Sequence, residues 1–196
     1  MSELETRYIG VDNLRFENGD DRPRIVGYAA VFNQQSNELR TAKGTRFREI
    51  MYPGAFAASV KGGDVRALVD HDSSKVLGRT KAGTLSIMED THGLLVSIDP
   101  PDTTYARDLI ESLKRGDISG MSIGFSIPDG GSHFERDSNN RLLHHVRSVN
   151  LSEVSVVTFP AYSETEVSVR TERALERAEV DPTVKLKLMR MRLDLI

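Results

Sequence analysis

The sequence predicts a mainly β fold with peripheral helices, and three observations support this. Segments with the alternation or the β-branched content of strands outnumber helical segments. Three of the expected strands, at 121–127, 142–149 and 151–159, follow one another without a helical crossover between them. The best helix covers residues 103–115, where apolar residues recur at a spacing of four. A mainly antiparallel sheet or barrel therefore fits better than a doubly wound parallel sheet.

The size and composition of the chain exclude several classes of protein. Its 196 residues suit one domain with short additional segments. It carries 26 Lys and Arg against 29 Asp and Glu, a net charge of −3, so we expect neither nucleic acid nor a membrane as a partner. No apolar run reaches the roughly 18 residues of a membrane helix and no signal peptide is evident, which predicts a soluble, cytoplasmic protein. Without cysteine, thiolate metal sites and a cysteine nucleophile are excluded, and we expect no cofactor.

The N-terminal half is expected to contain a polar leader at 1–23, followed by strands and a short helix. Asn18-Gly19-Asp20-Asp21 is typical of a turn and ends the leader. Proline is tolerated in the first turn of a helix, so the short helix can begin at Pro53, and Gly62-Gly63 ends it. The elements expected here are strands at 25–32 and 47–51, a helix at 53–60, and a strand at 65–71 that ends at His71.

The C-terminal half is expected to begin with a hairpin and to finish with a charged tail. The hairpin joins strands 83–88 and 93–98 through the turn at 89–92. Helix 103–115 ends at Gly116. Strands follow at 121–127, 142–149, 151–159 and 167–169, which gives a central domain at 24–170. Residues 171–196 form the tail, whose basic part from Val184 is read as an extended segment, with an amphipathic helix and a flexible tail as alternatives.

Three short motifs carry side chains suited to catalysis. His71 stands between Asp70 and Asp72 at a strand end, Ser122 lies in a glycine-rich strand, and Glu153 lies in an apolar strand. A buried carboxylate is costly unless it is paired or hydrogen-bonded, so Glu153 needs a partner. Together the motifs supply a nucleophile, a base and an acidic group that orients the base, which is the logic of serine hydrolysis.

Other functional readings of these residues are weaker. Gly120-x-Ser122-x-Gly124 matches the nucleophile elbow of α/β-hydrolases, but no helix can begin at the Pro128-Asp129-Gly130-Gly131 segment that follows, and His71 precedes the serine. His92 and His133 fall in expected turns, where solvation is their simplest role. No histidine and carboxylate cluster has the spacing of a metalloprotease motif, so no metal site is predicted.

The motifs of the chain resemble those of a known family, the prohead maturation serine proteases of tailed bacteriophages. The resemblance spans about residues 24–170 and rests on several ordered motifs at compatible spacings. These motifs are Tyr52–Phe56, His71-Asp72, Leu77–Thr80, Gly93-Leu94, Arg115-Gly116, Ser119–Phe125, Leu151–Val157 and Pro160–Tyr162. It implies a fold related to the herpesvirus assembly proteases, an antiparallel β-barrel wrapped by helices.

The resemblance also assigns roles to residues of this chain. Ser122 becomes the nucleophile, His71 the general base and Glu153 the third member of the triad. His144 and His145 remain alternatives for the third member, because the related herpesvirus enzymes use a second histidine there. Backbone N–H groups near Ala161-Tyr162 are candidates for the oxyanion hole.

The activity implied by the resemblance is that of a serine endopeptidase inside the assembling procapsid, in the host cytoplasm. Its partners would be the major capsid protein with its scaffolding segment, or a separate scaffold protein, and it would also cleave itself. A homodimer is suggested by the herpesvirus relatives. The alternative is a non-catalytic assembly factor with the same barrel that binds scaffold or capsid protein through the tail.

Overall fold

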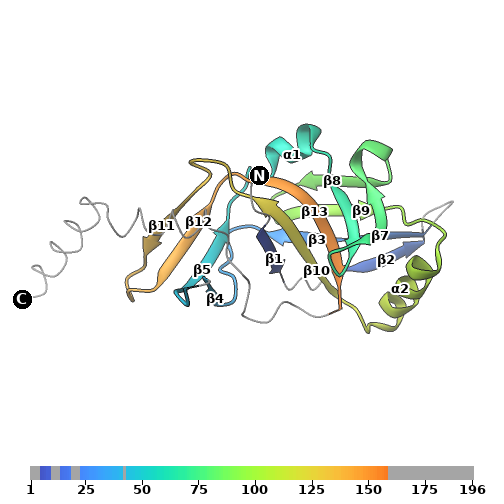
Figure 1. Ribbon diagram of the computed structural model, residues 1–196, viewed down its shortest axis with the longest axis horizontal. Helices are drawn as coiled ribbons and strands as arrows, with labels where there is room; N and C mark the ends of the chain where they lie inside the picture. Colours follow the sequence, from blue (N-terminus) through green and yellow to red (C-terminus); the bar gives the residue numbers. More distant parts are fainter. Residues whose placement is uncertain (1–4, 10–13, 19–22, 42, 159–196) are drawn as a thin grey trace, which may run out of the picture.

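The strands of the chain form three sheets, seen in a computed structural model that describes residues 5–9, 14–18, 23–41 and 43–158 (Figure 1). The first sheet has the order β1 (Glu5–Ile9), β10 (Gly120–Ser126), β13 (Asn150–Val157), β6 (Arg66–Val69) and β7 (Asp72–Arg79). The second has the order β2 (Arg15–Asn18), β3 (Pro23–Val31), β9 (Gly93–Ile98) and β8 (Leu85–Glu89). The third has the order β11 (Ser132–Arg136), β12 (Leu142–Val146), β5 (Arg46–Met51) and β4 (Leu39–Arg40).

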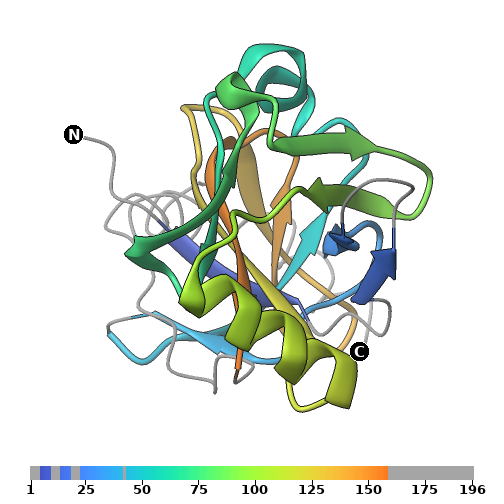
Figure 2. The same cartoon turned by 90° about the vertical axis from the view of Figure 1, so that its right-hand side faces the viewer.

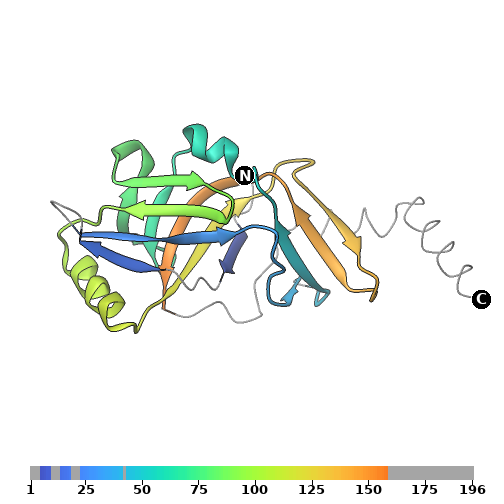
Figure 3. The ribbon, with the colours of Figure 1, turned by 180° about the vertical axis from the view of Figure 1, so that it is seen from behind.

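The first two sheets pack face to face around the main core. Figure 1 shows β10 and β13 in front of β3 and β9, and Figure 3, from behind, shows β3 and β9 in front. Ile123 and Phe125 of β10 point into this core and are fully buried, as are Ile25 of β3 and Val96 of β9. Each such side chain contributes roughly 1.5–3 kcal/mol of burial free energy. The packing therefore fixes which face of β10 is apolar and leaves the opposite face to Ser122.

The third sheet lies at the end of the molecule away from the longer helix (Figures 1 and 3). It has a second, smaller apolar cluster formed by Leu39, Phe47, Phe134 and Leu142. Its strands β5 and β12 are parallel, as are β6 and β13 in the first sheet. The other strand pairs described are antiparallel.

Two α-helices, α1 (Ala57–Gly62) and α2 (Thr104–Arg115), and a 3-10 turn η1 (Thr80–Ala82) accompany the sheets. Helix α2 lies on the side of the molecule that faces the viewer in Figure 2. It buries Ala106 and Leu109, and its exposed residues are polar. It ends at Gly116, whose φ of 78° is left-handed and suits glycine. The N–H groups of Gly116 and Asp117 then bond to carbonyls of the last helical turn, which satisfies acceptors that the helix itself leaves free.

The prediction of a mainly β chain with few helices is confirmed, whereas closure into a barrel stays a prediction because the described strands form three separate sheets. The helix expected at 53–60 begins only at Ala57, because a turn over 52–55 precedes it, with the Ala55 N–H bonded to the Tyr52 carbonyl. Strands β1, β2, β4, β7 and β11 were not predicted. The strand expected at 167–169 and the tail at 171–196 lie outside the described residues. No helix in the described part of the chain has the length and apolarity needed to cross a membrane.

Candidate active site

The polar face of β10 and β13 carries the residues that the sequence singles out. The antiparallel register places Ser122 opposite Ser155 and Gly124 opposite Glu153. Directly opposed residues in an antiparallel pair project to the same side of the sheet, so these four residues share one face. Ser122 is 1% exposed and Glu153 is 6% exposed. The predicted nucleophile and the predicted acid therefore come from neighbouring strands and project from the same face.

His71 reaches this face from the two-residue turn between β6 and β7. Asp70 and His71 both have positive φ, 48° and 59°, as the two central residues of a type I′ hairpin turn do. This conformation is uncommon for residues other than glycine, and it persists only when its surroundings hold it. Here the Asp70 N–H donates to the Val156 carbonyl at 2.9 Å, and the Asp70 carboxylate accepts from the N–H and the hydroxyl of Thr158 at 2.8 and 3.0 Å. These bonds tie the strained turn to β13.

The imidazole of His71 is bonded to Glu153. Nδ1 of His71 lies 2.6 Å from Oε1 of Glu153, and the Ser155 hydroxyl donates to Oε2 of the same carboxylate at 2.7 Å. The His71 N–H in turn donates to the Ser155 oxygen at 3.2 Å. An ionised carboxylate only accepts, so Nδ1 carries the proton and Nε2 keeps its lone pair. Such an imidazole can take a proton from a hydroxyl, and Glu153 would stabilise the imidazolium that results.

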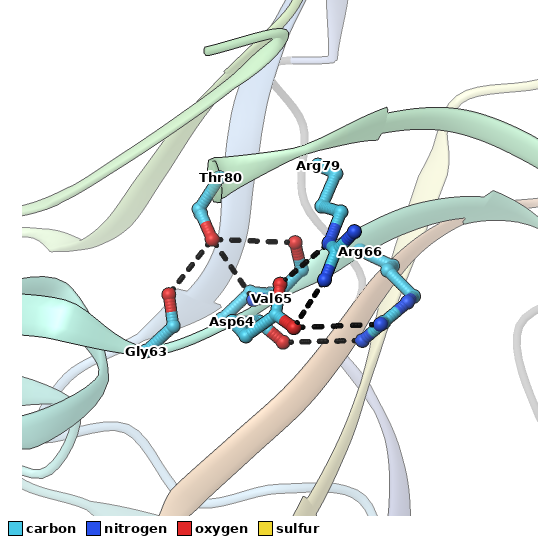
Figure 4. Close-up of polar contacts among 6 residues, drawn as sticks. All are labelled: Gly63, Asp64, Val65, Arg66, Arg79 and Thr80. Atoms are coloured by element: carbon cyan, nitrogen blue, oxygen red, sulfur yellow. Dashed lines mark hydrogen bonds and ion pairs between the residues drawn. The ribbon is translucent and has the colours of Figure 1, made fainter. Parts of the chain in front are cut away.

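The open end of the β6–β7 hairpin, opposite the turn that carries His71, is fixed by a second set of polar contacts (Figure 4). Two guanidinium nitrogens of Arg79 each donate to one carboxylate oxygen of Asp64 at 2.7 Å. This pairing holds the pKa of Asp64 at about 2. The Thr80 hydroxyl donates to the Gly63 carbonyl at 2.7 Å and accepts from the Val65 N–H at 3.0 Å. Both ends of the hairpin are thus anchored, which limits the freedom of the turn that carries His71.

Comparison with known proteins assigns the chain to a family. A family model described as the caudovirus prohead serine protease matches residues 12–179. The chain belongs to this family. It is 29% identical over 145 residues to the "Prohead protease" of Enterobacteria phage HK97, an alignment that covers 73% of this chain and 58% of that relative. The chain thus spans less than two thirds of the length of this curated relative. No solved structure gives a significant match.

The match confirms the resemblance to the prohead proteases. It leaves the roles of individual residues as proposals. Of the candidates for the third triad position, the structure brings Glu153 to His71. It places His144 and His145 on β12 of the third sheet, with other partners. The oxyanion-hole candidates Ala161 and Tyr162 lie outside the described residues.

His144, on β12 of the third sheet, also has the bonding pattern of a triad histidine. Its Nδ1 lies 2.9 Å from Glu49 Oε2, and its Nε2 lies 2.8 Å from Ser132 Oγ. The imidazole is fully buried, with the Phe134 ring stacked on it at 4.2 Å and the Phe47 ring edge-on at 5.9 Å. The bonds satisfy a histidine and a carboxylate inside the third sheet, which is sufficient reason for them.

The remaining histidines lie on the surface or near it. His145 has Nδ1 2.8 Å from the Tyr52 hydroxyl, and burial lowers its pKa. His133 was expected in a turn but lies on β11, where it stacks on His145 with ring centroids 4.8 Å apart. His92 lies in the β8–β9 turn as expected, with its N–H bonded to Asp90. Two contributions to the site were not predicted from the sequence. Ser155 bonds to both Glu153 and His71, and the Asp70 carboxylate bonds to Thr158 and so holds the turn that carries His71.

Replacing Gly124 by Ala is expected to lower kcat by about 10- to 100-fold. A Cβ at this position would overlap Oε1 of Glu153 and crowd the rest of its carboxyl group. The carboxylate would have to leave its place beside His71 Nδ1, and misplacement by about 1 Å can cost roughly 100-fold in rate. Peptide cleavage by the purified variant measures this. Gly62→Ala is the control, since no atom lies near a Cβ built there, and equal rates for both variants would contradict the role of Gly124.

Replacing Asp70 by Ala is expected to lower kcat by about 10-fold and the stability by about 1 kcal/mol, since it removes two hydrogen bonds from a turn with positive φ. Asp70→Asn should be milder because asparagine tolerates the left-handed region and keeps an acceptor. Asp72→Ala is the matched control on the other side of His71, because Asp72 bonds only to Ser74 and Lys75 among the contacts described. Kinetics and thermal unfolding check this. A larger rate loss for Asp72→Ala would refute the anchoring role.

Proposed function

We propose that this chain is a serine endopeptidase that matures the phage prohead. It would cleave the scaffolding part of the major capsid protein, or a separate scaffold protein, and itself. The observation that carries the proposal is the 2.6 Å contact between His71 Nδ1 and Glu153 Oε1 in a chain of the prohead protease family. Glu153 lies on the strand that pairs with the strand of Ser122, and both residues project from the same face of the sheet.

The proposed mechanism uses Ser122, His71 and Glu153. Nε2 of His71 takes the proton of the Ser122 hydroxyl as its oxygen attacks the scissile carbonyl carbon. The tetrahedral intermediate expels the amine, which receives that proton from His71, and an acyl-enzyme remains. His71 then removes a proton from water, which attacks the acyl group and releases the second product. Glu153 holds the tautomer and offsets the positive charge of the imidazolium in both steps.

Self-cleavage has support in the arrangement of the N-terminal strand. β1 lies beside β10 (Figure 1). The two strands are antiparallel, with Tyr8 opposite Ser122. Extended peptides commonly bind proteins by adding a strand to a sheet edge. A segment of the chain itself thus lies extended beside the strand of the proposed nucleophile, as a substrate would.

The finer features expected from the sequence belong to the same proposal. They are a barrel of the herpesvirus type, oxyanion donors near Ala161-Tyr162, a homodimer, and action in the procapsid within the host cytoplasm. They also include a protease domain at 24–170 with a tail at 171–196 and a leader at 1–23, whose strands β1 and β2 pair with β10 and β3 of the domain. The proposal includes no cofactor.

Intact mass spectrometry after co-expression with the neighbouring capsid protein tests the function. We expect defined truncations of the capsid protein and of the enzyme with the wild type, and full-length chains with Ser122→Ala. If both samples stay full length while the proteins still co-assemble, the protease assignment fails, and the non-catalytic assembly factor takes its place.

A further inference from the structure

A cluster of three side chains with metal-binding atoms lies on one face of the β11–β12 hairpin, on a sheet other than the one that carries His71 and Ser122. His133 and Glu135 alternate along β11, so both point to the same side, and His145 stands directly opposite His133 on β12. Each residue offers one ligand atom, and these atoms all lie within 4.8 Å of one another. The cluster was not evident from the sequence because its members come from two strands and follow no local ligand motif.

The contacts of His145 leave its Nε2 atom available to bind a metal ion. Nδ1 is held at 2.8 Å by the Tyr52 hydroxyl, and the Tyr52 ring stacks on the imidazole. Nε2 is buried and has no hydrogen-bond partner among the described residues. A buried polar nitrogen without a partner is unfavourable. When Nδ1 donates its proton to Tyr52, the Nε2 lone pair is free, which is the arrangement of metal-bound histidines whose other nitrogen bonds to an outer group.

The two other members can move to complete the site. Ligand atoms around a tetrahedral Zn²⁺ with bonds of about 2.1 Å lie about 3.4 Å apart, so the atoms of the cluster must approach one another by at most about 1.4 Å. His133 and Glu135 are exposed, and their side chains can make this adjustment by rotation without disturbing the core. His145, which is partly buried and fixed by Tyr52, would stay in place as the anchor of the site.

We propose that His133, Glu135 and His145 bind one divalent transition-metal ion, with Zn²⁺ the best fit to two imidazoles and one carboxylate. Water would fill the fourth position. The ion would join β11, the edge strand of the third sheet, to β12 and so stabilise the hairpin. This inference is independent of the proposed protease activity, since none of its ligands belongs to the His71 and Glu153 network.

Titration calorimetry of the untagged, chelator-treated full chain with ZnCl₂ tests the proposal, in a Ser122→Ala background so that self-cleavage cannot interfere. We expect one ion per chain with a micromolar dissociation constant, and a rise in the melting temperature with added Zn²⁺, because the ion binds the folded state. Co²⁺ should give the visible absorption of a four-coordinate site. Absence of stoichiometric binding would overturn the proposal.

Variants locate the ion and separate the site from adventitious binding. Glu135→Gln and His133→Ala change exposed residues and should each weaken binding at least 10-fold while the chain stays folded. Tyr52→Phe should weaken it about 10-fold by removing the outer partner of His145. His92→Ala, which changes a histidine in the β8–β9 turn, is the matched control and should bind as the parent does. Unchanged affinity in Glu135→Gln and His133→Ala would show that the ion sits elsewhere and would overturn the assignment.

Discussion

Ser122→Ala is expected to lower kcat for peptide cleavage by roughly 10⁴- to 10⁶-fold, since the acyl-enzyme cannot form without the hydroxyl. The fold should survive. Ser122 is buried on a strand whose other face packs into the core, and alanine fits the same space. Losing the hydroxyl costs about 1 kcal/mol of stability. A peptide that spans a mapped cleavage site, followed under single-turnover conditions, gives the rate.

Ser126→Ala is the matched control for this experiment. Ser126 lies on the same strand, four residues on, and is also buried, but its neighbour across the sheet is Asn150. We expect the Ser126→Ala variant to cleave the peptide at nearly the wild-type rate. A serine-directed fluorophosphonate should label the wild type and Ser126→Ala at Ser122 and leave Ser122→Ala unlabelled. Retained cleavage by Ser122→Ala free of contaminating protease would remove Ser122 from the mechanism.

The strand that carries Ser122 and the need of Glu153 for a bonding partner could both be predicted from the sequence, because the patterns that indicate them are local. Alternation along 121–127 put Ser122 on the small-residue face of a strand, and the structure has β10 there. The cost of burying a carboxylate in an apolar strand demanded a partner for Glu153, and His71 and Ser155 supply bonds to it. In both cases one physical rule, periodicity or desolvation, acts on residues that are adjacent in the chain.

The missed features depend on contacts between distant parts of the chain. Residues 73–76 of strand β7 are exposed and the strand has little apolar alternation, because it forms the edge of its sheet. Strand β11 buries only Phe134. The turn at Asp70-His71 lacks the glycine that marks such turns, because bonds to Thr158 and Ser155, more than 80 residues away, hold it instead. No local pattern encodes those bonds.

The histidines show why connectivity alone does not identify a catalytic triad. Ser132, His144 and Glu49 repeat the order of bonds expected of a triad, yet His144 is fully buried between two phenylalanine rings. The side chain of His71 is 32% exposed, while that of Glu153 is only 8% exposed. Exposure of the histidine side chain distinguishes the two networks.

Glu153→Gln and Glu49→Gln are expected to separate these two networks. Both residues are buried carboxylates bonded to a histidine Nδ1. In the proposed mechanism the charge of Glu153 fixes the tautomer of His71 and stabilises its imidazolium, so Glu153→Gln should lower kcat by about 10²- to 10⁴-fold with KM little changed. Glu49→Gln should lower the free energy of unfolding by about 1–3 kcal/mol and leave kcat of the folded enzyme unchanged.

Steady-state kinetics and chemical denaturation of both variants decide between the networks, because each variant has a distinct expected readout. The rate effect should follow Glu153, because Glu153 lies on the strand that pairs with the strand of Ser122, whereas Glu49 lies in the third sheet. If Glu49→Gln lowered kcat as much as Glu153→Gln while remaining folded, the third member of the triad would belong to the His144 network. If neither variant changed kcat, the base would act without a carboxylate, and His145→Ala would be the next variant to measure.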